Sequence, residues 1–288
     1  MRRFANKPNS NRRAAFTLVE MLVVITIIAL LAGIMLPSFN AVRNQAKAAA
    51  TNALVNNAIV TGLESYKAES KLGRQYPPDG WNTNATTGDP LKLGANYYAF
   101  GAQTLVWALA GADLLGTPGF PTDAEINGNP KITLKNEDNP PSEKGLYTLV
   151  NGKPLYQRFG PFIEIGKTKI KTPAELRYTK VDGSRIEVRV IADDFNMPIL
   201  YFRANPTQTG MSIYGRDNNW GFFAANNNCP FSNHSEQAND DWWRYIKDQR
   251  ITATDMPQNS ESYLLISAGI DKIYGTADDI TNFTPFMP

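Results

Sequence analysis

Cysteine and histidine are nearly absent from this sequence, which has one of each among its 288 residues, Cys229 and His234. A single cysteine excludes an internal disulfide framework and a multi-cysteine metal site. We interpret Cys229 as a small or half-buried thiol rather than a reactive group. A single histidine excludes His-rich zinc sites, and no nucleophile motif accompanies His234 that would give it an acid or base role.

Net charge is also small, because 29 Lys and Arg residues are balanced by 27 Asp and Glu residues, leaving +2. Such a balance gives no support for a nucleic-acid surface, and no nucleic-acid partner is expected. Acidic residues are missing altogether from the first fifteen positions, whereas five basic residues lie there: Arg2, Arg3, Lys7, Arg12 and Arg13. The N-terminal leader is therefore basic. By the positive-inside rule, the N-terminus stays in the cytoplasm and the chain after Leu36 is exported.

Catalytic motifs are missing as well. The sequence has no Gly-x-Ser-x-Gly, no phosphate-binding glycine loop and no His-Glu-x-x-His. Adjacent acids occur as pairs, but neighbouring residues of a strand point to opposite faces, so such pairs make poor acid and base partners. The pairs are Asp193-Asp194, Asp240-Asp241 and Asp278-Asp279. We expect that the chain is not an enzyme.

A long apolar run extends from Phe16 to Leu36, and from Met21 onwards only Thr26 and Gly33 interrupt its hydrophobic side chains. As a helix it would be about 31 Å long, which matches a hydrocarbon core of about 30 Å. One interpretation is an ordinary single-span anchor. Another is a secretory signal peptide, whose apolar region usually has about 7–15 residues and ends at a cut site between small residues. Neither explains the one acid near the start of the run, Glu20.

The basic leader, the small residue Ala15 and the sequence Phe16-Thr17-Leu18-Val19-Glu20 resemble the class III signal of type IV pilins and type II secretion pseudopilins. In that family a prepilin peptidase cuts on the cytoplasmic side and methylates the new amine. The resemblance implies cleavage between Ala15 and Phe16, N-methylation of Phe16, and retention of the apolar segment. Pro37 falls where the family commonly has a helix-bending proline, whereas Ala15 departs from the family's usual glycine.

Glu20 is the predicted assembly residue. In a filament of staggered apolar helices, its carboxylate can meet the N-terminal amine of Phe16 on a neighbouring subunit, and pairing lowers the cost of burying both charges. The alternative is that Glu20 lies at the membrane interface and is merely hydrated. We favour the pairing because Glu20 lies in the first turn of the apolar segment.

The predicted fold class is α+β, with a pilin-like layout in which a long N-terminal helix packs on an antiparallel sheet with loop-rich insertions. Apolar residues recur at helical spacing after Pro37, so one helix is expected from about Phe16 to Ser70, ending before the breaker cluster at 76–80. The predicted parts are a leader (1–15), a membrane or filament-core helix (16–36), an amphipathic helix (37–70) and an exported globular domain (71–288).

Within the globular part, residues 101–115 predict a buried helix that places Trp107 in the core, and residues 116–145 predict a long surface insertion. A short helix is expected over 236–249, with Trp242, Trp243 and Tyr245 exposed or half-buried, packing being favoured over a ligand role. Alternating or apolar runs predict strands at 185–191, 199–203 and 262–267, the first two joined as a hairpin by the turn at 193–198.

The segment from Ser267 to Ile280 is rich in Asp and Gly, as calcium loops are. It resembles the C-terminal loop of the type II secretion major pseudopilin, where an Ala-Gly-x-Asp stretch and a later Asp-Asp pair surround a calcium ion. The turn at 193–198 is similar to a second stretch of that family. The resemblance implies calcium ligands at Asp271, Thr276, Asp278 and Asp279. The alternative is a solvated turn without metal.

These observations predict a structural subunit of a type II secretion pseudopilus or a type IV pilus-like filament, anchored in the bacterial inner membrane. Its expected partners are other pilin or pseudopilin subunits, the prepilin peptidase and an inner-membrane assembly platform. The alternative is a membrane-tethered binding or adhesion module in the periplasm or outside the cell that uses a pilin-type export signal.

Overall fold

The computed structural model describes residues 17–79, 100–111, 113–120, 149–151, 153–154, 157–172, 175–176, 189–205, 208–219, 222–223, 226, 228–233 and 235–286. By their contacts, the residues form two compact units, Met1–Ala46 and Lys47–Pro288. The leader, most of the predicted insertion at 116–145 and His234 lie outside the described residues, and the predicted domain boundaries stay predictions.

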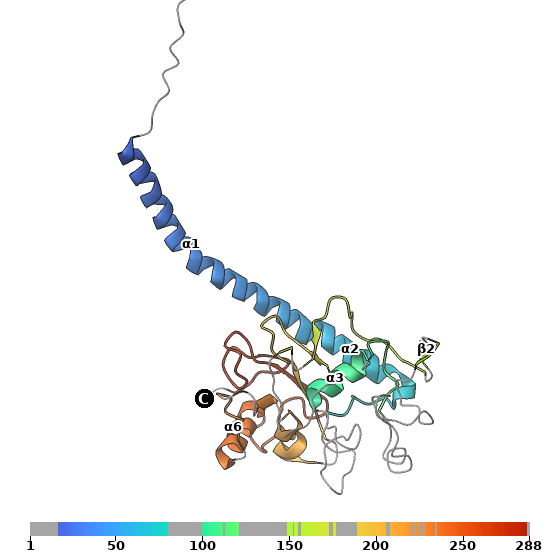
Figure 1. Cartoon of the computed structure of the whole chain (residues 1–288). Helices are drawn as coiled ribbons and strands as arrows, with labels where there is room; N and C mark the ends of the chain where they lie inside the picture. Colours follow the sequence, from blue (N-terminus) through green and yellow to red (C-terminus); the bar gives the residue numbers. More distant parts are fainter. Residues whose placement is uncertain are drawn as a thin grey trace, which may run out of the picture. The chain divides into compact units, whose positions relative to one another are not determined.

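The N-terminal helix is continuous in hydrogen bonding from Leu18 to Ala68 (Figure 1). It comprises α1 (Leu18–Ala53), a π-helical stretch η1 (Leu54–Ile59) and α2 (Val60–Ala68). The helix predicted over 16–70 is confirmed, although its end comes two residues earlier because Glu69 adopts an extended conformation. The π-helical stretch was not predicted.

In the first unit, the apolar side chains of α1 are exposed: Leu18, Ile25 and Leu30, for example, are 80%, 62% and 65% exposed. Within the described residues, this is the one helix long and apolar enough to cross a membrane. Hydrophobic surface of this extent is stable only when lipid or another protein covers it. The unit therefore requires a nonpolar environment that the chain itself does not provide.

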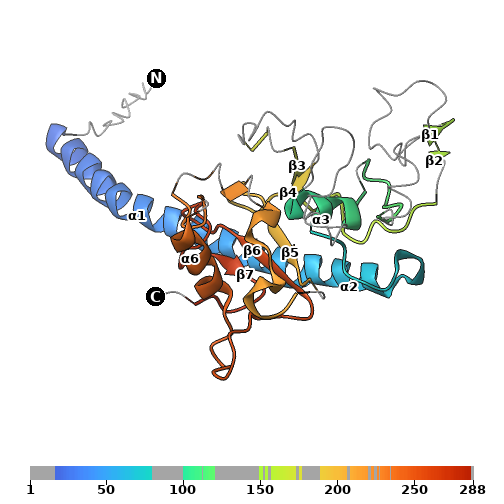
Figure 2. The ribbon, with the colours of Figure 1, turned by 90° about the horizontal axis from the view of Figure 1, so that it is seen from below.

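In the second unit, the main sheet has three antiparallel strands in the order β5-β6-β7, formed by Leu200–Arg203, Tyr263–Ser267 and Ile280–Thr281 (Figure 2). Leu200 pairs with Ile266 and Arg203 with Tyr263, so the two strands predicted at 199–203 and 262–267 are confirmed and are neighbours. The α+β class is confirmed as well.

Alternate residues of β5 and β6 point to opposite faces of this sheet and belong to two different hydrophobic clusters. Tyr201 and Leu265 belong to a cluster with Val55, Ile59 and Leu63 of the N-terminal helix. Phe202 and Ile266 belong to an aromatic-rich cluster on the other side. The long helix predicted to pack on a sheet therefore does so through η1, and α2 packs against α3.

Helix α3 (Gly101–Leu109) is buried at every position, as predicted, and packs against α2, β4 and β5. Gly101 starts it against β5, where a Cβ atom would lie 1.9 Å from the carbonyl oxygen of Tyr201. The helix is shorter than the predicted 101–115, because Gly111 and Leu114 have φ of +82° and +63°, outside the helical region. Trp107 is 1% exposed, so its predicted place in the core is confirmed.

Two smaller sheets complete the described strands: β1 (Leu149–Val150) with β2 (Lys153–Pro154), and β3 (Ile170–Lys171) with β4 (Val190–Ile191). The predicted turn at 193–198 does reverse the chain, since Asp193 N donates to Met197 O and Ala192 forms a bridge with Pro198. Ile199 N donates to Ile191 O at 2.8 Å, so the predicted hairpin is present next to its turn, whereas residues 185–188 of its first predicted strand lie outside the described residues. β4 forms its ladder with β3, and β5 forms its ladder with β6.

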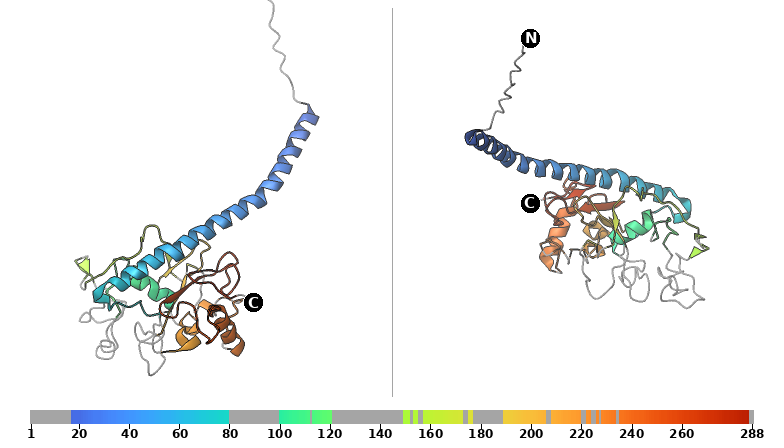
Figure 3. Two further views of the ribbon diagram at one scale, coloured as in Figure 1. Left: turned by 180° about the vertical axis from the view of Figure 1, so that it is seen from behind. Right: turned by 45° about the horizontal axis from the view of Figure 1, so that its top comes forward.

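Helix α6 (Glu236–Ile246) covers the second face of the main sheet (Figure 3). Its predicted presence is confirmed, but the exposure predicted for Trp242 and Tyr245 is wrong: they are 1% and 2% exposed, and only Trp243, at 42%, lies outside. The helix is strongly amphipathic, so two of its three aromatic residues point into the core.

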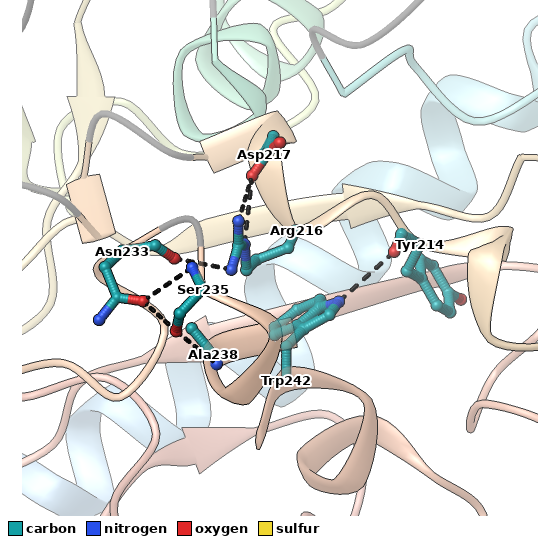
Figure 4. A network of polar contacts seen from close by, with 7 residues as sticks. All are labelled: Tyr214, Arg216, Asp217, Asn233, Ser235, Ala238 and Trp242. Carbon is teal, nitrogen blue, oxygen red and sulfur yellow. Dashed lines mark hydrogen bonds and ion pairs between the residues drawn. The ribbon is translucent and has the colours of Figure 1, made fainter. Parts of the chain in front are cut away.

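A polar network holds the start of α6 in place (Figure 4). Ser235 caps the helix, because its Oγ accepts a hydrogen bond from Ala238 N at 3.1 Å. The same Oγ donates to Asn233 Oδ1. Arg216 Nη1 donates to Asn233 O at 2.9 Å, and Trp242 Nε1 donates to Tyr214 O at 3.4 Å. The network joins two distant segments of the chain around the aromatic core.

Candidate functional site

The N-terminus of α1 is a capping box formed by Thr17 and Glu20. Thr17 is the last residue before the helix, and its N and Oγ1 both donate to Glu20 Oε2 at 2.8 Å. In return, Glu20 N donates to Thr17 Oγ1 at 3.2 Å. This reciprocal pattern satisfies two N–H groups at the first helical turn, which have no partner within the helix.

The sequence carries the signature of this box, Thr-x-x-Glu before an apolar run, but the predictions for Glu20 were a partner in another subunit or hydration at the membrane interface, and not a helix cap. The structure gives the same carboxylate an intrachain role. Only Oε2 takes part in the hydrogen bonds found within the described residues, so Oε1 is left to accept from a further donor. The two roles of Glu20, as cap and as assembly residue, are thus compatible in geometry.

The predicted cleavage site, Ala15 and Phe16, lies outside the described residues, which begin at Thr17. Helix α1 begins at Leu18, so the described helix starts three residues after Ala15. The predicted pairing of Glu20 with an amine of a second chain stays a prediction.

The second predicted site, the loop between β6 and β7, is closed by hydrogen bonds around Asp278. Its Oδ2 accepts from Ile270 N at 2.5 Å and from Asp271 N at 2.9 Å, and its Oδ1 accepts from Thr276 Oγ1 at 2.9 Å. Burial raises the pKa of Asp278, but these hydrogen bonds outweigh it, and the net result is a lowered pKa. Gly269 has φ +62° and is so close to Asp278 that a Cβ would meet its carbonyl oxygen at 2.2 Å.

Asp279 points the other way, towards α6. Its Oδ2 accepts from Tyr245 Oη at 2.5 Å and from Gly275 N at 2.7 Å, whereas its buried Oδ1 has no hydrogen-bond partner in the described part of the chain. Burial raises the pKa of Asp279 to about 7, with the hydrogen bonds from Tyr245 and Gly275 acting against the rise. The adjacent acids Asp278 and Asp279 therefore serve two different sets of donors.

In this structure the acids of the loop accept hydrogen bonds from donors of the protein itself, and calcium binding stays a prediction. Within the described residues, which include the whole loop, no three His, Cys, Asp or Glu side chains form a group that could hold a metal. Asp271 Oδ1 accepts from Ile273 N at 2.8 Å, and the oxygens of Asp278 face N–H and O–H donors. Calcium requires six to eight oxygens aimed at one point. Asp271, Thr276, Asp278 and Asp279 share the loop as predicted, but they are not aimed at one centre.

A third acidic residue, Asp193, has a structural role that the sequence did not reveal. Its Oδ1 accepts from Phe195 N and Met197 N, each at 2.8 Å, and its Oδ2 accepts from Ser267 Oγ at 2.6 Å. Burial raises the pKa of this carboxyl group. The side chain thus fastens the 193–198 turn to the end of β6, where the C-terminal loop begins.

Cys229 is buried, being 3% exposed, and burial raises the pKa of its thiol to about 12. A thiol with such a pKa holds its proton at neutral pH and is a poor nucleophile. The prediction of an unreactive thiol agrees with this environment, although the side chain is fully rather than half buried.

Comparison with known families identifies the N-terminal segment. Residues 10–36 match the family model described as the prokaryotic N-terminal methylation motif. No curated protein and no solved structure matches the chain significantly. The matched segment spans the predicted cleavage site, the capping box and the exposed apolar part of α1, so the class III signal of type IV pilins and pseudopilins is present in this chain.

Proposed function

We propose that this chain is a structural subunit of a type II secretion pseudopilus or a type IV pilus-like filament. The observation that carries the proposal is the methylation motif at residues 10–36, which marks the chain as a pilin-like substrate of a prepilin peptidase. The motif coincides with a helix whose apolar side chains are exposed. A retained apolar helix needs other helices of its kind once it leaves the lipid.

In this proposal the peptidase cuts between Ala15 and Phe16 and methylates the new amine. The helix holds the subunit in the inner membrane, with its N-terminus in the cytoplasm and the globular domain in the periplasm, until an assembly platform adds it to a filament. The role is structural and not catalytic.

In this proposal Glu20 fixes the position of each subunit along the filament, by pairing with the N-terminal amine of a neighbouring subunit. Removal of a partner from a charge pair in a nonpolar environment costs about 3–5 kcal/mol, because the remaining charge is left uncompensated. A subunit that lacked the carboxylate would therefore insert into the membrane but fail to pair with the amine of its neighbour.

Three substitutions separate this role from helix capping. Glu20→Ala removes both cap and charge, Glu20→Gln retains a capping side chain without the charge, and Thr17→Ala breaks the box while leaving the charge. Membranes from producing cells are treated with a cross-linker, and subunit ladders are compared by immunoblot. We expect full membrane insertion of all three variants and at least a tenfold loss of ladders for both Glu20 variants, with Thr17→Ala close to the parent.

Ladders of normal intensity from Glu20→Gln would show that the charge does not set the register. Loss of ladders from Thr17→Ala as well as from Glu20→Ala would assign the effect to the helix cap.

Calcium binding by the loop at 267–280 stays a separate proposal, which rests on the resemblance to the major pseudopilin. The ion would have to replace the N–H groups that now bond to Asp278, so the loop would have to rearrange. If calcium binds, millimolar calcium should raise the unfolding temperature of the solubilised full chain, and magnesium at the same concentration should not. Absence of both heat in a calorimetric titration and a thermal shift would exclude the site.

A further inference from the structure

A cavity of about 690 Å³ lies in the second unit, where the end of α2 meets the end of β5. Its lining comes from three parts of the chain that are far apart in the sequence: Lys67 and residues 74–76, then residues 203–205, 208–210 and 213, and then Met256 and residues 260–262. Its volume falls within the range of about 300–1,000 Å³ that is typical of ligand sites. None of the predicted site residues takes part in it.

The charge of this cavity is mainly positive. Lys67, Arg74 and Arg203 line it, against one acid, Glu261. No ion pair joins any of these three basic side chains to a carboxylate among the described residues. Two further acids adjoin the lining, since Glu64 Oε1 accepts from Tyr76 Oη at 2.8 Å and Asp79 Oδ2 accepts from Arg203 N at 2.9 Å. The feature that marks the cavity is therefore three basic side chains that no ion pair occupies among the described residues, and not a large net charge.

The guanidinium of Arg203 is positioned by the protein itself. Its Nη2 donates to Gln75 Oε1 at 2.8 Å, while the backbone N of the same residue donates to Asp79 Oδ2 at 2.9 Å. Only part of the five-donor fork is used by these contacts, so the remaining N–H groups can bind a planar carboxylate. Neutral hydrogen-bonding side chains surround the cations: Gln75, Gln208, Thr209, Ser260 and Ser262.

Two features decide how a ligand would be recognised. The ring of Tyr76 is engaged, with Lys67 Nζ 4.1 Å from its centroid and the ring of Tyr263 packed edge-on at 4.8 Å, so it offers no free platform for stacking a sugar. The edge of β5 is also occupied. Asp79 Oδ2 accepts a hydrogen bond from Arg203 N, and Asn219 Nδ2 donates one to the carbonyl oxygen of Tyr201 at 2.8 Å. Strand addition at this edge is therefore blocked.

We propose that this cavity binds the side-chain carboxylates of an acidic peptide segment of a partner protein. Arg74 and Arg203 bind the carboxylates, Lys67 adds a positive charge, and the amide and hydroxyl side chains hydrogen-bond to the peptide backbone. The site lies on the globular unit and takes Lys67 from the end of α2 but nothing from the exposed apolar part of α1, so it would hold whether or not the filament proposal is correct.

The test measures binding of a fluorescein-labelled hexaglutamate peptide to the detergent-solubilised full chain by fluorescence anisotropy. A hexaglutamine peptide and polygalacturonate are the comparison ligands. We expect hexaglutamate to bind at low salt, with affinity falling at least tenfold between 50 and 300 mM salt, because exposed charges are screened over about 10 Å or less. Hexaglutamine and polygalacturonate should bind at least tenfold more weakly.

Arg74→Gln and Arg203→Gln should each weaken hexaglutamate binding five- to tenfold, since each removes a charge-assisted contact. Arg74 is exposed and no side-chain hydrogen bond of it is found among the described residues, so Arg74→Gln tests the proposal even if Arg203→Gln does not fold. The matched control is Lys167→Gln, which removes an exposed cation that pairs with Glu164 and is not part of the cavity lining, and it should bind as the parent does.

Equal binding of hexaglutamate and hexaglutamine, or an Arg74→Gln variant that binds like the parent, would overturn the proposal. An equal loss in Lys167→Gln would also overturn it, because it would show attraction by net charge alone. Preferential binding of polygalacturonate that depends on Arg74 would overturn the assignment to a peptide and favour an acidic glycan.

Discussion

At the scale of single residues, the buried carboxyl group of Asp79 shows how the protein tolerates an acid in its core. Asp79 is 5% exposed and accepts hydrogen bonds from Arg203 N and Asn218 Nδ2. Burial raises the pKa of Asp79 to about 6, and the hydrogen bonds from Asn218 and Arg203 limit the rise. Because the native state binds this proton more tightly than the unfolded state does, the carboxyl group stabilises the native state. The stabilisation is complete below the unfolded pKa of about 3.9 and is lost as the pH rises through about 6.

Asp79→Asn should therefore change the pH dependence of stability. The amide does not titrate, and with its oxygen in the place of Oδ2 it can accept from both Arg203 N and Asn218 Nδ2, the two donors that Oδ2 now serves. We expect the free energy of unfolding of the variant, relative to the parent, to rise by roughly 1–3 kcal/mol between pH 4 and pH 8. Urea unfolding of the solubilised full chain at both pH values measures it.

Asp79→Ala is the contrast for that experiment, since it leaves the N–H of Arg203 without its acceptor and should be less stable than the parent at both pH values. A difference between Asp79→Asn and the parent that is the same at pH 4 and pH 8 would contradict the assigned role of burial.

At the scale of elements, the turn at 193–198 connects three parts of the second unit. Asp193 joins the turn to β6 through Ser267, and Asp194 N donates to Thr51 Oγ1 of α1 at 3.2 Å. A side chain that satisfies two backbone N–H groups and one hydroxyl in the interior cannot be removed without leaving those donors unpaired. The turn is thus more important for the sheet than its short single-bridge pairing suggests.

Asp193→Ala should lower the free energy of unfolding by about 2–4 kcal/mol, because three buried donors lose their acceptor. Asp194→Ala is the matched control, since its carboxylate forms an exposed ion pair with Lys169 and its loss should cost about 1 kcal/mol or less. Thermal unfolding followed by circular dichroism compares the two. Equal losses in both variants would show that Asp193 does not fasten the turn to β6.

The elements themselves were largely predictable, and the failures have identifiable causes. The long helix, α3, α6 and the strands at 199–203 and 262–267 follow from hydrophobic periodicity, which is a local property. Strand pairing is not local, so the sequence predicted the hairpin next to its turn but not the ladders that β4 forms with β3 and β5 forms with β6. Burial of Trp242 and Tyr245 also depends on distant residues, such as Phe202 and Phe231, that the sequence alone does not bring together.

The candidate sites divide in the same way. Glu20 was recognised from its position in an apolar run, and its cap partner Thr17 could have been found three residues before it from the spacing alone. The cavity around Arg203 could not have been found, because its lining comes from three distant stretches without a shared motif. The sequence shows that the acids of the C-terminal loop are close together along the chain. The directions in which their side chains point depend on hydrogen bonds from Tyr245, Gly275 and the loop backbone, which the sequence does not show.

At the scale of the whole molecule, the proposed role as a filament subunit requires that the apolar helix stays attached to the globular unit. The motif at residues 10–36 predicts that the peptidase removes the leader alone. Helix α1 continues into residues that the globular unit buries, such as Val55 and Ile59, so loss of the apolar part would not disrupt the core but would remove the element by which the subunit assembles.

The mass of the mature N-terminus, determined by mass spectrometry on protein isolated from the membrane of producing cells, tests this claim most directly. The account predicts a chain that begins at Phe16 and carries one methyl group on its amine. An intact leader, or a chain that begins near Gly33 without the apolar helix, would contradict it.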